Sequence, residues 1–93
     1  MEVLEKVRLN LRRTSNALDE DIREDIAAAY EDLKRVGVNI DDPEKPLIIK
    51  AVKLYCRWQD NFAGMGDRYQ AAYEKLRDAM SISLDYKEVR QDV

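Results

Sequence analysis

The sequence predicts an all-α protein, a compact bundle of about four helices followed by an extended C-terminal tail. Apolar residues recur every three or four positions through most of residues 1–81, the period that gathers side chains on one face of an α-helix. The 3 Gly and 2 Pro lie between these segments or at their ends. With 45% hydrophobic and 38% charged residues, the composition is typical of a folded globular chain.

The first two helices are expected over residues 2–13 and from Leu18 to Val36. Arg12 and Arg13 fall in the last turn of the first helix, where the helix dipole favours positive charge. Gly37 follows the second helix and can take the left-handed conformation that closes a helix. The first turn and outer face of this second helix are acidic, with Asp19, Glu20, Asp21, Glu24 and Glu31.

Residues 38–46 have the composition of a loop, and a third helix is expected over about 46–63. The Gly64-Met65-Gly66 sequence then interrupts the chain. Asp67 is a candidate N-cap for a fourth helix, which carries the apolar stripe from Tyr69 to Met80. The aromatic residues of both helices and the single cysteine are expected to be mainly core: Cys56, Trp58, Phe62, Tyr69 and Tyr73.

The tail, residues 82–93, follows the helical domain of residues 1–81 and has a different pattern. Ile82, Leu84 and Tyr86 alternate with polar residues, which is the two-residue period of a strand. No other segment of the chain predicts a strand that could pair with it. The tail is therefore expected either to be disordered or to add a strand to a sheet edge in a partner.

The residue types needed for most catalytic and metal sites are missing. There is no histidine, and the single Cys56 can form neither an internal disulfide nor a thiolate metal site. The acidic loop 41–44 lacks the ligand spacing of a calcium loop, and no phosphate-binding glycine motif occurs. Asp21 and Asp25 are expected to form a solvated carboxylate pair. We therefore expect a protein that is not an enzyme and has no cofactor or metal.

The charge and hydropathy patterns limit the class of partner. No segment has the apolar length of a signal peptide core or a membrane span, so a soluble cytoplasmic protein is expected. A net charge of -3 argues against strong nonspecific binding to nucleic acid. A DNA-binding regulator remains a minor alternative, because the loop before the third helix is too long for a helix-turn-helix and Leu47, Ile48 and Ile49 open that helix.

Several segments together resemble the phage head–tail connector family. They are the leading amphipathic helix, the Gly37 stop, and the sequences Ile26-Ala27-Ala28-Ala29-Tyr30, Pro46 through Tyr55, Tyr69-Gln70-Ala71-Ala72-Tyr73-Glu74-Lys75-Leu76 and Leu84-Asp85-Tyr86. The resemblance covers most of the chain and rests mainly on helix-packing patterns. Members of this family are small helical adaptors of tailed phages and prophages.

The resemblance implies a ring of about a dozen subunits beneath the portal protein, located in the virion neck after assembly in the host bacterial cytoplasm. Such a ring extends the DNA channel, without sequence-specific binding, and provides a docking platform for a downstream neck or tail-completion protein. Neighbouring subunits could attract each other through the basic first helix and the acidic start of the second. Another small helical adaptor is the main alternative. The candidate interface residues are Arg12, Arg13, Asp19, Glu20, Glu24, Asp42, Ile82, Leu84 and Tyr86.

Overall fold

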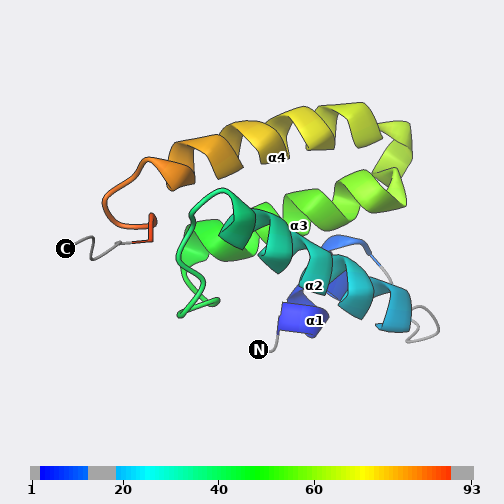
Figure 1. Ribbon diagram of the computed structural model, residues 1–93. Helices are drawn as coiled ribbons and strands as arrows, with labels where there is room; N and C mark the ends of the chain where they lie inside the picture. The colour runs from blue at the N-terminus through cyan, green and yellow to red at the C-terminus, as the bar shows by residue number, and fades with distance from the viewer. Residues whose placement is uncertain (1–2, 13–18, 89–93) are drawn as a thin grey trace.

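The computed structural model describes residues 3–12 and 19–88, and this part of the chain forms four α-helices and one short 3-10 helix (Figure 1). The predicted all-α class is confirmed. The helix α4 runs back along α3 after a tight turn, while α2 and α1 lie against the other side of α3. The elements are α1 (Val3–Asn10), α2 (Asp19–Arg35), α3 (Pro46–Asp60), η1 (Phe62–Gly64) and α4 (Gly66–Ser81).

The core is built around α3, which contacts each of the other three α-helices. Its inner side is fully buried and consists of small and medium apolar residues, so neighbouring helices can approach closely. Cys56 belongs to this side, as predicted. Burial, with smaller contributions from Asp25 and Asp60, raises the pKa of the Cys56 thiol to about 12, which keeps it protonated. The buried residues of α3 are Ile48, Ala51, Val52 and Cys56.

The predicted stop of α2 at Gly37 is confirmed. Gly37 has a φ of 93°, which is the left-handed region. Its N–H donates to the Lys34 carbonyl at 3.0 Å, and the Val38 N–H donates to the Leu33 carbonyl at 3.0 Å. These two hydrogen bonds form a Schellman motif, and the buried Val38 packs into the core beside the helix end.

The turn between α3 and α4 depends on Asn61, which the sequence analysis did not identify. Asn61 adopts a left-handed conformation with a φ of 49°, and so α3 ends at Asp60. The Asn61 side-chain oxygen accepts a hydrogen bond from the Gly66 N–H at 2.9 Å. A Cβ at Gly66 would lie 2.7 Å from that oxygen. The prediction of Asp67 as the cap is wrong, because α4 already begins at Gly66 and Asp67 lies in its first turn.

After α4 the chain turns back on itself in residues 82–88, which we call the hook. The Lys87 N–H donates to the Ser83 carbonyl at 2.8 Å, and Lys87 then forms an antiparallel bridge with Val38. The prediction of a strand without a partner in the chain is therefore wrong for these residues. The remainder of the predicted tail, residues 89–93, lies outside the described residues. Flanking the bridge are hydrogen bonds from Asn39 N–H to Tyr86 O and from Glu88 N–H to Gly37 O, both 2.7 Å.

Two leucines test the position of the core. Leu33 is 0% exposed, whereas Leu9 on α1 is 59% exposed. We expect Leu33→Ala to lower the free energy of unfolding by about 2–5 kcal/mol, because it removes buried methyl groups and leaves a cavity. Leu9→Ala is the matched control and should change it by less than about 0.5 kcal/mol. Chemical denaturation followed by circular dichroism measures both, and equal losses would contradict the assigned core.

Candidate interaction surfaces

The hook presents two apolar side chains to solvent. Ile82 is 79% exposed and Leu84 is 83% exposed, the highest values among the large hydrophobic residues that are exposed in the described part of the chain. Tyr86, the third residue of the alternating pattern, instead packs partly buried against the core. Of the three predicted interface residues of the tail, Ile82 and Leu84 are therefore exposed, whereas Tyr86 attaches the hook to the core.

Lys45, at the start of α3, fixes the hook from the other side. Its ammonium group donates to the Asp85 carbonyl at 2.5 Å and lies 4.3 Å from the centre of the Tyr86 ring. A cation over an aromatic face is attracted by the negative charge of the ring face. Together with the backbone bridge to Val38, these contacts hold Ile82 and Leu84 in a defined position on the surface.

A groove lies between α1, α2 and the loop that precedes α3, with a volume of about 520 Å³. We call it the α1–α2 groove. Its walls are mainly apolar, and three charged residues also line it, Arg23, Asp42 and Glu44. Asp42, a predicted interface residue, thus borders a surface hollow. The other lining residues are Val3, Leu4, Ile26, Ala27, Tyr30 and Pro43.

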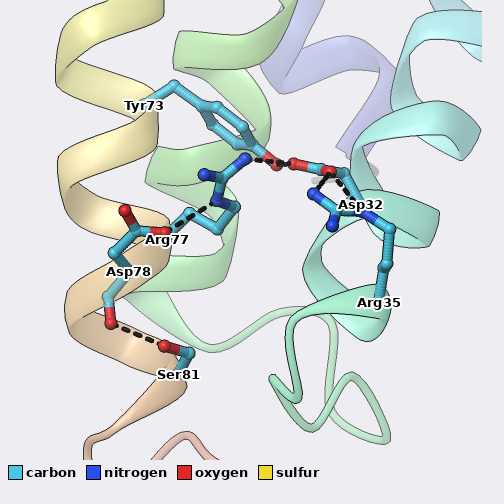
Figure 2. Close-up of polar contacts among 6 residues, drawn as sticks. All are labelled: Asp32, Arg35, Tyr73, Arg77, Asp78 and Ser81. Atoms are coloured by element: carbon cyan, nitrogen blue, oxygen red, sulfur yellow. Dashed lines mark hydrogen bonds and ion pairs between the residues drawn. The ribbon is translucent and has the colours of Figure 1, made fainter.

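A polar network on the opposite side of α2 joins α2 to α4 (Figure 2). One oxygen of Asp32 accepts hydrogen bonds from the Tyr73 hydroxyl at 2.6 Å and from Arg77 at 3.0 Å. The other oxygen accepts two from Arg35, at 2.7 Å and 3.1 Å. Burial alone would raise the pKa of Asp32, but these hydrogen bonds outweigh it and lower the pKa below its usual 3.8.

The network provides a hydrogen-bond acceptor for the hydroxyl of Tyr73, whose side chain is wholly buried. Its ring lies edge-on to Tyr55, with centroids 5.2 Å apart, and 6.2 Å from the Trp58 ring. Burial and the Asp32 carboxylate raise the pKa of Tyr73, so its hydroxyl stays a hydrogen-bond donor. Trp58 and Phe62 are partly buried against the core, in line with their predicted packing role.

Arg57 links separate parts of the fold through contacts that were not predicted from the sequence. Its guanidinium donates to the Asn10 carbonyl at 2.9 Å and to the Tyr69 hydroxyl at 3.3 Å. The same group lies 4.5 Å from the centre of the Phe62 ring. Arg57 thereby connects the C-terminal end of α1 to the turn between α3 and α4. Arg57 lies in the last turn of α3, where a basic residue is common, so its position gave no signal of this contact.

The prediction that Arg12, a candidate interface residue, lies in the last turn of the first helix is wrong, because α1 ends at Asn10. Arg12 is exposed, has a φ of 57°, and its guanidinium lies 5.9 Å from the centre of the Phe62 ring. It therefore contacts the turn between α3 and α4 of its own chain while remaining accessible. Arg13 lies outside the described residues.

The predicted acidic residues at the start of α2 differ in exposure. Asp19 is ion-paired with Arg8 of α1 at 3.5 Å, and its side chain is only 16% exposed. The attraction between basic α1 and acidic α2 thus already operates within the chain. Glu20 is exposed and pairs with Arg23 at 3.5 Å, and Glu24 is exposed as well. Glu20 and Glu24 therefore remain accessible on the outer face of α2, unlike Asp19.

Asp25 departs from the expected solvated pair. It is half-buried, and its pKa is raised by burial and by the neighbouring carboxylates of Asp21, Glu24 and Asp60. Within residues 3–12 and 19–88, no group of three or more acidic or cysteine side chains is placed to hold a metal ion. None of the helices in the same residues has both the length and the apolar character needed to cross a bilayer.

Comparisons with protein-family models, with curated proteins and with solved structures found no match. The hook and the α1–α2 groove are accessible surface features of the described chain. Both present apolar side chains together with charged ones, and Asp42 lines both the groove and a smaller hollow beside Asp85 of the hook.

The Asp32 network predicts a pH-dependent stability. We expect Asp32→Asn to lower the free energy of unfolding by about 1–3 kcal/mol at neutral pH, because it removes charge-assisted hydrogen bonds. Since the folded state lowers the pKa of Asp32, its stabilisation is present above pH 3.8 and is lost as the pH falls through the folded value. The difference between wild type and variant should therefore narrow below pH 3.8.

Denaturant titrations between about pH 7 and about pH 2 measure this effect. Asp78→Asn is the matched control, because Asp78 accepts from Arg77 at 3.0 Å on the exposed side of the network. Asp78→Asn should lower the free energy of unfolding by less than about 0.5 kcal/mol. A difference for Asp32→Asn that is constant with pH would contradict the assigned role of the carboxylate.

The attachment of the hook can be tested with trypsin, which cleaves after Lys87. We expect Tyr86→Ala to accelerate this cleavage at least about fivefold, because losing more than about 1 kcal/mol of packing increases the population of the open hook. Leu84→Ala changes an exposed neighbour and should leave the rate close to wild type. Mass spectrometry identifies the products. The cleavage rate of each folded protein is divided by the rate for the same chain when unfolded, so that only the opening of the hook is compared. Equal rates for all three proteins would show that Tyr86 does not hold the hook.

Proposed function

We propose that this chain is a structural subunit of a phage or prophage head–tail connector. In this proposal the subunits form a ring under the portal, extend its DNA channel, and provide the docking platform for neck or tail proteins. The observation that carries the proposal is the hook, which holds Ile82 and Leu84 almost fully exposed through contacts with Tyr86 and Lys45. The sequence resemblance supports the particular setting.

The energetics of the hook favour association. Burying a leucine or isoleucine side chain contributes about 1.5–3 kcal/mol relative to leaving it exposed. A contact that covers Ile82 and Leu84 therefore gains this stabilisation, and a ring repeats the gain at every subunit interface. The hook is already folded within its own chain, so ordering it on binding costs less conformational entropy than ordering a disordered tail.

The acidic balance of the chain is compatible with a channel through which DNA slides. With a net charge of -3, the subunit should bind phosphates only weakly, because such binding depends on Lys and Arg neutralising them. The proposed role requires neither catalysis nor a cofactor. It places the protein in the virion neck, with assembly in the cytoplasm of the host bacterium.

Stoichiometry tests this function. We expect the purified chain, concentrated alone or mixed with the portal protein of the same phage or prophage, to form rings of about a dozen subunits in electron micrographs and sedimentation experiments. Leu84→Asp should reduce assembly while keeping the helical circular dichroism spectrum, because the side chain lies outside the core. A closed dimer, or a monomer that ignores the portal, would instead favour the broader alternative of a small helical adaptor.

A further inference from the structure

We propose that neighbouring copies of the chain exchange their hooks, so that residues 85–88 of one copy occupy the acceptor site of the next. The acceptor site is residues 37–39 together with Lys45, which hold the hook of the same chain in the closed arrangement (Figure 1). Residues 82–84 are the hinge. The inference rests on the proposed ring, in which the second copy is the neighbouring subunit. Exchange of an identical element is a low-cost route to association.

The fit between hook and acceptor site is observed within one chain. Two backbone hydrogen bonds of 2.7 Å join Tyr86 to Asn39 and Glu88 to Gly37. The Lys45 ammonium group lies 4.3 Å from the centre of the Tyr86 ring, which packs against the core. Since every copy has the same hook and the same acceptor site, identical contacts form when the hook comes from another copy. The observed contacts therefore select a second copy of the chain as the partner.

Net charge does not decide between the closed and the exchanged arrangement. Asp85 and Glu88 outnumber Lys87 in the hook, and the nearby hollow is also lined by Asp41 and Asp42. The same groups meet whether the hook comes from its own chain or from a neighbour, so exchange leaves this repulsion unchanged. The two arrangements differ instead at the hinge.

The backbone of the hinge does not force the closed turn. Ile82, directly after α4, has a φ of -113° and a ψ of 0°, still in the right-handed helical region. The residues with positive φ in the described chain all lie outside the hook, and no glycine or proline follows Gly66 in the sequence. Ser83 O closes the turn by accepting from Tyr86 N–H at 3.1 Å and Lys87 N–H at 2.8 Å. Water can replace these bonds when the hinge straightens.

A straightened hinge also accounts for the alternating apolar residues. In the closed hook, Ile82 and Leu84 are exposed while Tyr86 packs against the core. In an extended chain, side chains two residues apart project from the same side, so all three then form one apolar face. When Tyr86 enters the acceptor site of the neighbour, the other two lie against that neighbour. Exchange thus covers apolar side chains that the closed hook leaves in water.

Concentration and ring closure control the exchange. A closed hook meets its own acceptor site at an effective concentration on the order of millimolar, so free copies stay closed when dilute. High concentration, or gathering of subunits on the portal, favours exchange. Residues 85–88 are held by the same contacts in both arrangements, while residues 82–86, when extended, reach at most about 18 Å. Each copy gives its hook to one neighbour and receives one from the other, and such head-to-tail contacts close into rings.

A disulfide that locks the hook closed tests the exchange. Val38 and Lys87 are a non-hydrogen-bonded antiparallel pair, a type whose Cα atoms lie about 4.5 Å apart and can be bridged. The double variant Val38→Cys/Lys87→Cys, oxidised while dilute, should assemble neither when concentrated nor on the portal, and reduction should restore assembly. Sedimentation velocity and electron microscopy measure assembly, and circular dichroism checks the fold. Val38→Cys alone is the control for the core substitution and should assemble equally in both redox states.

Variants with one added cysteine detect the exchange directly. Val38→Cys and Lys87→Cys proteins are concentrated together and mildly oxidised, and we expect a disulfide-linked pair containing one chain of each. Closed hooks would keep the two thiols in separate molecules. The yield should exceed several-fold that obtained with Glu20→Cys in place of Val38→Cys, because Glu20 is exposed at the other end of α2 from the acceptor site. The buried Cys56 is present throughout, so the wild-type chain measures the background.

The outcomes separate the exchange from the proposed ring. Rings formed by the locked variant would overturn the exchange and leave the connector function standing. A cross-linked pair of the two variants within a closed dimer would support the exchange and overturn the ring. Reduced chains that neither assemble nor cross-link, with and without the portal, would overturn both proposals.

Discussion

The burial of one side of α3 is the constraint on which the other features of the fold depend. Ile48, Ala51, Val52 and Cys56 are all buried there, and α3 contacts each of the other α-helices. Polar groups near this core must consequently find partners at its edges. Tyr73 illustrates the result, because its ring is wholly buried while its hydroxyl reaches Asp32 at 2.6 Å. A buried hydroxyl without such a partner would destabilise the fold.

The Asp32 network fixes the relation between α2 and α4 because one carboxylate serves donors from both helices (Figure 2). Apolar packing alone tolerates small shifts of one helix along another, whereas directed hydrogen bonds to a charged group favour one alignment. Asp32 precedes the end of α2, so this alignment also positions Gly37 and Val38. The Val38 backbone in turn pairs with Lys87 of the hook. The alignment of α2 and α4 therefore also helps to position the hook at the surface.

Local patterns predicted most of the fold, and contacts distant in sequence account for the rest. The helical periods and the Gly37 stop depend on residues within a few positions, so they were predicted correctly. The predicted ends of two helices were too late, because α1 ends at Asn10 and not at 13, and α3 ends at Asp60 and not at 63. The hydrogen bond at the start of α4 was not predicted, because Asn61 reaches the Gly66 N–H from five positions earlier. For the hook, the exposure of Ile82 and Leu84 was anticipated. Its turn was not predicted, because a short alternating pattern does not distinguish a strand from a turn in which one side chain, here Tyr86, packs against the core. The groove was not predictable, since three separate segments form it.

The position of the hook explains why a small chain can keep such apolar residues exposed. Ile82 and Leu84 follow α4, outside the core, so their exposure does not weaken the packing around α3. Their location is nevertheless defined by Tyr86, Lys45 and the Val38 bridge. A preformed contact loses little conformational freedom on association, and a closed ring makes each subunit contact two neighbours. In the proposed ring, individually modest contacts of this kind would therefore hold the assembly together while the separate subunit remains an ordinary folded domain.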